Sequence, residues 1–165
     1  MSRPGVKPVL NRRRAARFAA VQALYQVDLL GERPEVVCRE FGEHRLSRLF
    51  ESVEEAEEDG PSPEVDREWF QILVKGAWAA HVRLDPELED SLAEGWTLAR
   101  CGFLLRACLR AGAYELADRT DVPVKVVINE YVELAHLFFD ASEPAFVNAV
   151  LDRLAARLRA VDPGL

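Results

Sequence analysis

The sequence lacks the features that several large classes of protein require. No run of 18 apolar residues occurs, which argues against a membrane-spanning helix, and residues 1–10 lack the apolar stretch of a secretory signal. Only three cysteines are present, and none belongs to a CxxC motif. An odd number without that motif favours buried free thiols in a reducing compartment over a disulfide framework. We therefore expect a cytoplasmic protein with the free thiols Cys38, Cys101 and Cys108.

Signatures of catalysis are also missing. The three histidines are scattered and form no HExxH or similar metal-binding spacing. The sequence contains neither a glycine-rich phosphate loop nor a G-x-S-x-G motif. We expect a protein that is not an enzyme and that uses no metal and no cofactor.

Charge is distributed unevenly along the chain. The net charge is −7, which argues against a protein whose whole surface binds nucleic acid. Residues 1–17 nevertheless hold six basic residues and no acid, so all 28 acidic residues lie beyond them. A cationic end on an acidic body is typical of a segment that meets a polyanion.

Apolar residues recur at helical spacing along most of the chain. The run Val124–Ile128 is the one β-like stretch, but helical spacing continues from it through Phe138. Cap and stop signals divide the pattern and predict an all-α fold of about seven helices. The first helix is expected from Asn11 to about Leu30, the second over about 34–50, the third from Pro63, a short fourth from Asp85-Pro86-Glu87, the fifth over about 98–117, the sixth from 121–123 and the seventh after Asp140 or Ser142.

The helices are expected to form two halves. Residues 1–10 are predicted to be a disordered basic tail, 11–82 an N-terminal three-helix half and 83–165 a C-terminal four-helix half. The acid-rich segment 51–59 is interpreted as a solvated loop. A glycine inside a helix costs about 1 kcal/mol relative to alanine, so Gly112 marks either a close helix contact or a tolerated weakness. The expected core stripe of the first helix is Phe18, Val21, Leu24, Tyr25 and Leu29.

Four of the basic residues stand at the start of the first expected helix. Cations are unfavourable there by roughly 0.3–1 kcal/mol each, because a helix N-terminus carries partial positive charge. Their presence favours a phosphate-bearing partner, to which arginine offers forked contacts and a flat face for unpaired bases. A solubilising terminus explains the charge equally well. The candidate RNA-binding arginines are Arg12, Arg13, Arg14 and Arg17.

Four blocks resemble the NusB family and occur in the family's order across residues 11–158. The first is RRRAAR (12–17) followed by VQALY (21–25), and the second is RAGAYEL (110–116). The third is DVPVKVVINEYVELA (121–135), and the fourth is FVNAVLD (146–152). The chain departs from the family in having Ala149 where glycine follows F-V-N, Ala145 where a basic residue often precedes that Phe, and Gly102-Phe103-Leu104-Leu105 where an acid often stands.

The resemblance implies an all-helical fold in two halves and a bacterial role in transcription antitermination. In that family the partner is NusE, which is also a small-subunit ribosomal protein. The pair binds single-stranded boxA RNA in nascent transcripts such as ribosomal RNA leaders. It thereby helps RNA polymerase elongate past terminators. No catalysis and no cofactor are implied.

Further candidate residues follow from the matched blocks. Lys125 and Asn129 are one turn apart on the polar side of the sixth helix, and Asn148 points away from the apolar stripe of the seventh. Phe146 is suited to stack on an unpaired base, although a core position explains it as well. We hypothesise one continuous RNA path from the first-helix arginines to these residues. Tyr25 is the candidate partner-binding residue, with a core role as the alternative.

Two other functions compete with this interpretation. NusB-like domains also occur at the front of certain RNA cytosine methyltransferases, which would require a following Rossmann-like domain. A purely structural helical protein that binds no RNA is the third class, and binding measurements with and without the partner separate it from the first.

Overall fold

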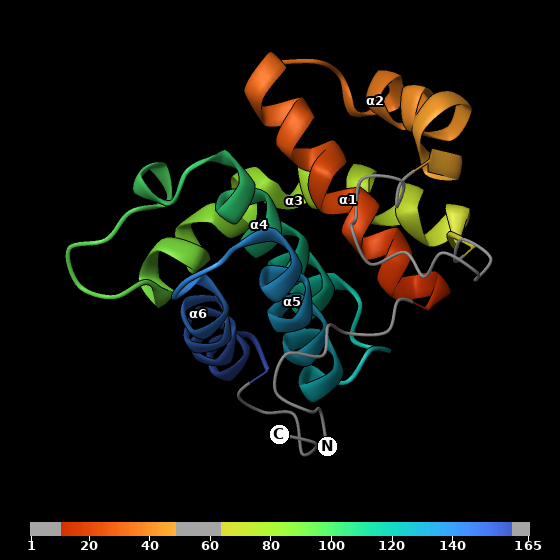
Figure 1. Cartoon of the computed structure of the whole chain (residues 1–165). Coiled ribbons are helices and arrows are strands. Elements are labelled where there is room, and N and C mark those ends of the chain that lie inside the picture. The colour runs from red at the N-terminus through yellow and green to blue at the C-terminus, as the bar shows by residue number, and fades with distance from the viewer. Residues whose placement is uncertain (1–10, 49–63, 160–165) are drawn as a thin grey trace.

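The computed structural model describes residues 11–48 and 64–159, which contain helices and connecting loops and no strand. The fold is therefore all-α, as predicted, with six α-helices in these ranges. Figure 1 shows their order: α4 lies in the interior and packs against α1, α3, α5 and α6. The helices are α1 (Arg12–Leu30), α2 (Pro34–Glu40), α3 (Arg67–Ser91), α4 (Phe103–Asp118), α5 (Val124–Phe138) and α6 (Glu143–Leu158).

Local sequence signals set both ends of α1. The side chain of Asn11 accepts a hydrogen bond from the backbone N–H of Arg14 at 2.8 Å, which satisfies one of the free donors of the first turn. At the other end Gly31 adopts a left-handed conformation with φ of 68°, and its N–H returns to the carbonyl of Val27. The predicted start and end of this helix are confirmed.

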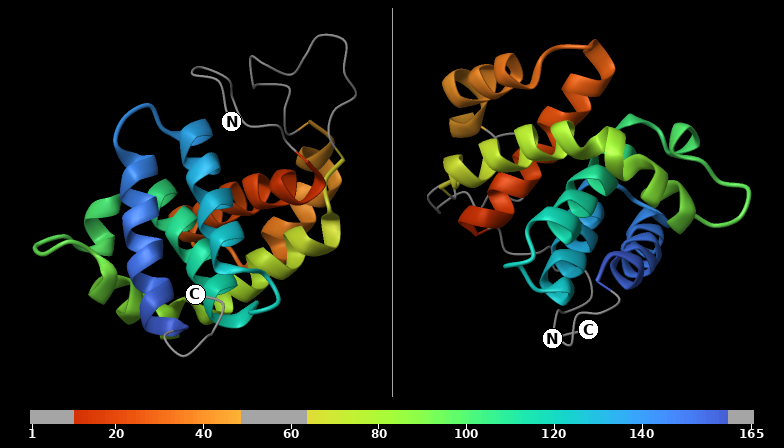
Figure 2. Two further views of the ribbon diagram at one scale, coloured as in Figure 1. Left: turned by 90° about the horizontal axis from the view of Figure 1, so that it is seen from below. Right: turned by 180° about the vertical axis from the view of Figure 1, so that it is seen from behind.

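Small residues let the helices approach one another closely. The α1 residues Ala15, Ala16, Ala19 and Ala20 are fully buried, and α1 packs against α3, α4 and α5. A Cβ atom placed on Gly112 of α4 would come within 2.9 Å of the Leu151 side chain of α6. Gly112 therefore marks a close helix contact, which was one of its two interpretations. Figure 2 shows the antiparallel pair α5 and α6 side by side in both views.

Three predicted boundaries are wrong. Residues 85–87 do not open a separate helix, because α3 continues through Pro86 to Ser91. Proline removes one helical hydrogen bond, but Leu84 and Leu88 on either side are buried and hold the segment in the core. The boundary proposed between residues 82 and 83 thus falls inside one continuous helix.

The other two differences concern turns at helix ends. Leu98–Cys101 form a short 3-10 helix, and α4 begins only after Gly102, whose φ of 79° breaks the expected single helix. The second predicted helix ends as an α-helix at Glu40 and continues as a π-helical turn, Phe41–Arg45, and a 3-10 turn, Leu46–Arg48. The expected tail, the acid-rich segment 51–59 and the Pro63 helix start lie outside the described residues.

All three cysteines are free thiols, as predicted. Cys38 and Cys108 are buried free thiols, and Cys101 is a partly buried one. Burial raises the pKa of Cys108 to about 12 and that of Cys38 to about 11, so neither thiol is activated. Across 11–48 and 64–159, every helix is too short or too polar to span a bilayer, and no cluster of potential metal ligands occurs.

Candidate nucleic-acid and partner interfaces

Arg17, the last arginine of the cluster, lies in the core. Its side chain is 4% exposed, and its guanidinium donates to both carboxylate oxygens of Glu115 on α4 at 2.8 and 2.9 Å. The hydroxyl of Tyr131 on α5 donates to the same carboxylate. Burial lowers the pKa of Arg17, but the hydrogen bonds to Glu115 and the electrostatic attraction of Tyr131, Glu115 and Glu130 together outweigh it, so the net pKa is raised. A buried charge requires such a partner, so the structure removes Arg17 from the candidate RNA surface.

Arg14 joins α1 to α5 near the surface. Its guanidinium donates to both carboxylate oxygens of Glu130 at 2.8 and 2.9 Å, and the two side chains are 13% and 11% exposed. The hydrogen bond to Glu130 raises the pKa of Arg14. This forked geometry fixes the guanidinium. Arg14 therefore positions α1 against α5, and little of its side-chain surface is accessible to RNA.

Arg12 and Arg13 are the arginines of the cluster that face solvent. Arg12 lies 3.7 Å from Glu64, and Arg13 lies 3.7 Å from Asp66, with arginine side chains 69% and 52% exposed. The guanidinium carbon of Arg13 also stands 4.4 Å from the centre of the Trp69 ring. Exposed ion pairs of this kind contribute about 0–1 kcal/mol, so phosphate groups can compete for both arginines.

A shallow hollow separates the start of α1 from the start of α5. Arg12 and Arg13 line one side, and Pro123 and Val126 line the other, together with the acids Asp121 and Glu130. The first turns of both helices contain no acid, so their free N–H groups add to the positive potential of the arginines. Lys125 and Asn129 are exposed on α5, as predicted for its polar side, and neither of them lines this hollow.

The predicted residues of α6 lie elsewhere. Asn148 is exposed, whereas Phe146 is partly buried against the core and meets Trp96 edge to face with ring centres 5.9 Å apart. Trp96 follows the C-terminal end of α3, and Arg13 contacts its N-terminal end. A helix of 25 residues spans roughly 37 Å. Lys125 and Asn129 thus lie on the helix whose start lines the hollow with the exposed arginines, and Phe146 lies at the opposite end of α3.

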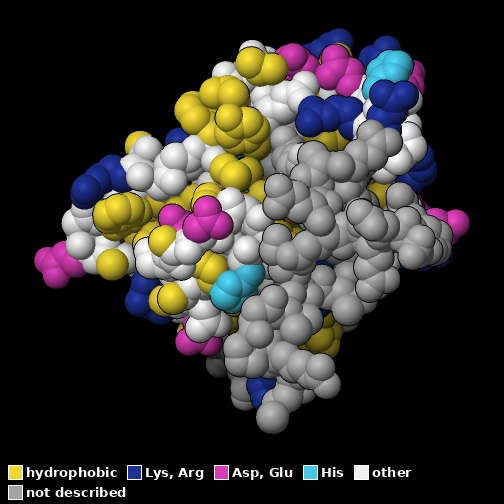
Figure 3. All heavy atoms as spheres, viewed as in Figure 1, with side chains coloured by type: hydrophobic (Ala, Val, Ile, Leu, Met, Phe, Trp, Pro, Cys, Tyr) yellow, Lys and Arg dark blue, Asp and Glu magenta, His cyan; other side chains and the backbone are white. Residues whose placement is uncertain are grey.

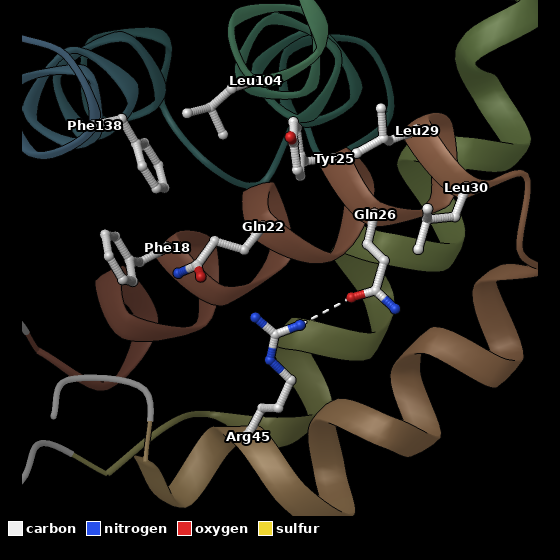
Figure 4. A pocket seen from close by; sticks show the side chains of 9 residues that line it. All are labelled: Phe18, Gln22, Tyr25, Gln26, Leu29, Leu30, Arg45, Leu104 and Phe138. Carbon is white, nitrogen blue, oxygen red and sulfur yellow. Dashed lines mark hydrogen bonds between the residues drawn. The ribbon is translucent and has the colours of Figure 1, made fainter. Parts of the chain in front are cut away.

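An apolar groove runs along the outer side of α1. Phe18, Tyr25, Leu29 and Leu30 of α1 line it together with Leu104 and Phe138, and Arg45 donates to Gln26 at its edge (Figure 4). Tyr25 is 36% exposed and Leu29 44%, so the prediction that these two residues belong to the core stripe is wrong. Figure 3 shows this concentration of hydrophobic side chains on the surface near the C-terminal end of α1.

Sequence reasoning missed two aromatic residues of these surfaces. Phe103 is 39% exposed and meets Tyr25 edge to face with ring centres 6.5 Å apart. Trp69 is 2% exposed, and the guanidiniums of Arg13 and Arg119 stack on its ring. Helical spacing gave no signal for Phe103, because α4 begins only at this residue, after the break at Gly102.

Known proteins resemble this chain in sequence and in fold. The model of the NusB family matches residues 14–156. A transcription antitermination protein NusB of Rhizobium rhizogenes is 47% identical over 150 residues, which cover 90% of this chain and 89% of the relative. Among solved structures, NusB of T. maritima has a TM-score of 0.67 at 25% identity, covering 91% of this chain and 92% of that one.

A second solved structure shows a related protein in a complex. It contains the antitermination factors NusB and NusE with dsRNA, and its matched chain has a TM-score of 0.68 at 25% identity, covering 87% of this chain and 96% of that one. The family match covers the apolar groove and the described core, whereas Arg12 and Arg13 precede its first residue. The chain therefore belongs to the NusB family.

Proposed function

We propose that this protein is a bacterial transcription antitermination factor that binds boxA-type single-stranded RNA together with NusE. The observation that carries the proposal is the family match over residues 14–156. The related complex of NusB, NusE and dsRNA supports both partners. RNA polymerase is then reached indirectly, through the nascent transcript and NusE, and the protein acts in the cytoplasm.

The RNA surface begins at the hollow between α1 and α5. Arg12 and Arg13 supply exposed positive charge held only by weak surface pairs. Lys125 and Asn129 extend the surface along α5, and phosphate contacts of this kind position RNA without reading its sequence. The exposed Asn148 and the ring of Phe146 continue the proposed path on α6.

The NusE surface is the apolar groove around Tyr25. Exposed apolar side chains gathered in one patch mark an interaction site more often than scattered ones. Tyr25 and Phe103 supply aromatic anchors of the type that dominates protein interfaces. The RNA surface lies at the starts of α1 and α5 and the groove extends toward their ends, so RNA and NusE can bind at the same time.

We propose no catalytic role. The relative from Rhizobium rhizogenes is matched over most of its own length and bears the name of an antitermination protein. That match favours an antitermination factor over the front domain of an RNA methyltransferase.

Binding to labelled RNA tests the proposal. Fluorescence anisotropy with a single-stranded boxA-containing RNA from a ribosomal RNA leader is measured with and without purified NusE. We expect binding that NusE strengthens, and stronger binding to this RNA than to a scrambled strand. No binding to RNA in either condition, combined with binding to NusE, would identify the protein as a structural partner that does not contact RNA.

A further inference from the structure

The loop between α3 and α4 presents an exposed tryptophan. Trp96 is 38% exposed, whereas Trp69 is 2% exposed. Its indole N–H donates to the sulfur of Cys101 at 3.2 Å, which fixes the edge of the ring. Gly95 on one side and Gly102 on the other have φ of 82° and 79°. Two glycines with positive φ therefore bracket the segment that holds this ring at the surface.

Arg100 stacks on Trp96. Its guanidinium carbon is 4.6 Å from the centre of the indole ring, and its Nη1 donates to the carbonyl oxygen of Gly95 at 2.9 Å. No carboxylate within the described ranges pairs with Arg100. This distinguishes it from Arg12, Arg13, Arg14 and Arg17, each of which has a carboxylate within 4 Å. Arg100 is thus an exposed and ordered cation whose charge is not neutralised locally.

Phe146 completes the cluster. Its ring meets Trp96 edge to face and packs on the core behind it, so the platform has a rigid support. The cluster therefore consists of the exposed indole of Trp96, the planar cation of Arg100 and the supporting ring of Phe146. Unpaired RNA bases stack on aromatic rings and on guanidinium planes, while paired bases remain inside the helix.

We propose that Trp96 and Arg100, supported by Phe146, form a stacking site for one or two unpaired RNA bases. The inference rests on the proposed function and deepens it, because the site lies at the end of α3 opposite Arg12 and Arg13. The exposed arginines hold phosphates at one end of the molecule, and this platform holds bases at the other. A strand that contacts both sites must be unpaired at the platform, which makes the protein select single-stranded over double-stranded RNA there.

Substitution of the indole tests the site. Anisotropy is measured with a labelled single-stranded boxA-containing RNA from a ribosomal RNA leader, and with the same strand annealed to its complement. Trp96→Ala should weaken binding of the single strand about 10-fold, within the range expected for loss of one stacked base. Binding of the duplex should stay the same. Trp96→Phe should keep most of the affinity. Arg100→Ala should weaken binding of the single strand more than Arg39→Ala does. Arg39 is an exposed arginine on α2, so its substitution controls for the loss of one positive charge.

Two further readouts separate stacking from a structural role. RNA should quench the tryptophan fluorescence of the wild type, and Trp96→Phe should lose most of that quenching while its melting temperature stays close to that of the wild type. Wild-type affinity of Trp96→Ala for the single strand would overturn the inference and leave the proposed function standing. An equal loss for single strand and duplex would also overturn it. Failure of the wild type to bind RNA even with NusE would instead refute the proposed function.

Discussion

Arg17 and Glu115 form the buried ion pair that ties α1 to α4, and their side chains are 4% and 0% exposed. The carboxylate of Glu115 also accepts a hydrogen bond from the hydroxyl of Tyr131, so one acid connects α1, α4 and α5. Removing a single partner from such a network leaves an uncompensated charge in a medium of low polarity. At the scale of single residues, burial therefore decides which arginines stabilise the fold and which remain available to a ligand.

The first prediction compares a buried arginine with an exposed one. Arg17→Ala should lower the free energy of unfolding by about 3–5 kcal/mol, because Glu115 loses its cation. Arg12→Ala should lower it by less than about 1 kcal/mol, because its pair with Glu64 is exposed. Urea denaturation followed by circular dichroism measures both. Equal effects of the two substitutions would show that the buried pair contributes no more than a surface pair.

The second prediction concerns alkaline pH. Burial raises the pKa of Tyr131 well above its ordinary value of 10 in the folded state. The stabilisation that the protonated Tyr131 hydroxyl contributes is complete below pH 10. It is lost as the pH rises toward the raised pKa of the folded state, because Tyr131 releases its proton at a lower pH in the unfolded chain. Tyr131→Phe removes this group, so its free energy of unfolding should fall less steeply between pH 9.5 and 11 than that of the wild type.

The measurement is a series of urea titrations across that range. At pH 7 the same variant should be less stable than the wild type by about 1–3 kcal/mol, because Glu115 loses a hydrogen-bond donor. Identical alkaline slopes in the two proteins would mean that Tyr131 does not control this pH dependence.

At the scale of elements, the close packing of α3 on α4 depends on a glycine. A Cβ atom on Gly76 would overlap the ring of Tyr114, whereas a Cβ on Gly42 would meet nothing closer than 3.9 Å. Alanine is otherwise the better helix former by about 1 kcal/mol. The two glycines therefore separate the effect of packing from that of helix propensity.

The third prediction uses this matched pair. Gly76→Ala should destabilise the protein, since overpacking typically costs about 1–3 kcal/mol and exceeds the gain in propensity. Gly42→Ala should leave stability unchanged or slightly higher. Thermal unfolding measures the difference, and a melting temperature of Gly76→Ala at or above that of Gly42→Ala would refute the packing argument.

At the scale of the whole molecule, an acidic chain carries the two surfaces that we propose for RNA and NusE, and both include α1. The net charge of −7 repels RNA in general, so binding depends on local patches of positive charge. Arg12 and Arg13 lie at the start of α1, and Tyr25 lies about three and a half turns further along it. The spacing allows each surface to be disabled separately.

The fourth prediction tests that separation. Replacing both Arg12 and Arg13 with alanine should weaken RNA binding and reduce the salt slope by up to about 1.4, because fewer counterions are released from a single strand. Binding to NusE should not change. Tyr25→Ala should weaken NusE binding by about 30-fold or more, as expected for an interface anchor, and leave the RNA salt slope intact.

Anisotropy over a range of salt concentrations and calorimetry with NusE provide the two measurements. If the double arginine variant keeps the wild-type salt slope, the exposed arginines do not contact phosphate. If Tyr25→Phe and Tyr25→Ala bind NusE as the wild type does, the groove is not the partner surface.

The sequence by itself determined the fold class, the ends of α1 and the family. Asn11 and Gly31 carry local cap signals, and helical spacing through 124–138 outweighed the β-like run at the start of α5. These features depend on residues close together in the chain, so they can be read without knowledge of the packing. The ordered family blocks added the functional hypothesis, which the match over residues 14–156 supports.

Only the tertiary structure decided what the individual side chains do. Arg13 and Arg17 are four positions apart in one motif, yet Arg13 is exposed and Arg17 is paired with Glu115, which lies 98 positions away. Tyr25 shares the helical spacing of the core stripe but lies at the edge of its buried face, and Trp96 becomes a neighbour of Phe146 only through the loop before α4. Periodicity reports which side of a helix is apolar, whereas ion pairs and ring contacts depend on which distant helix covers that side.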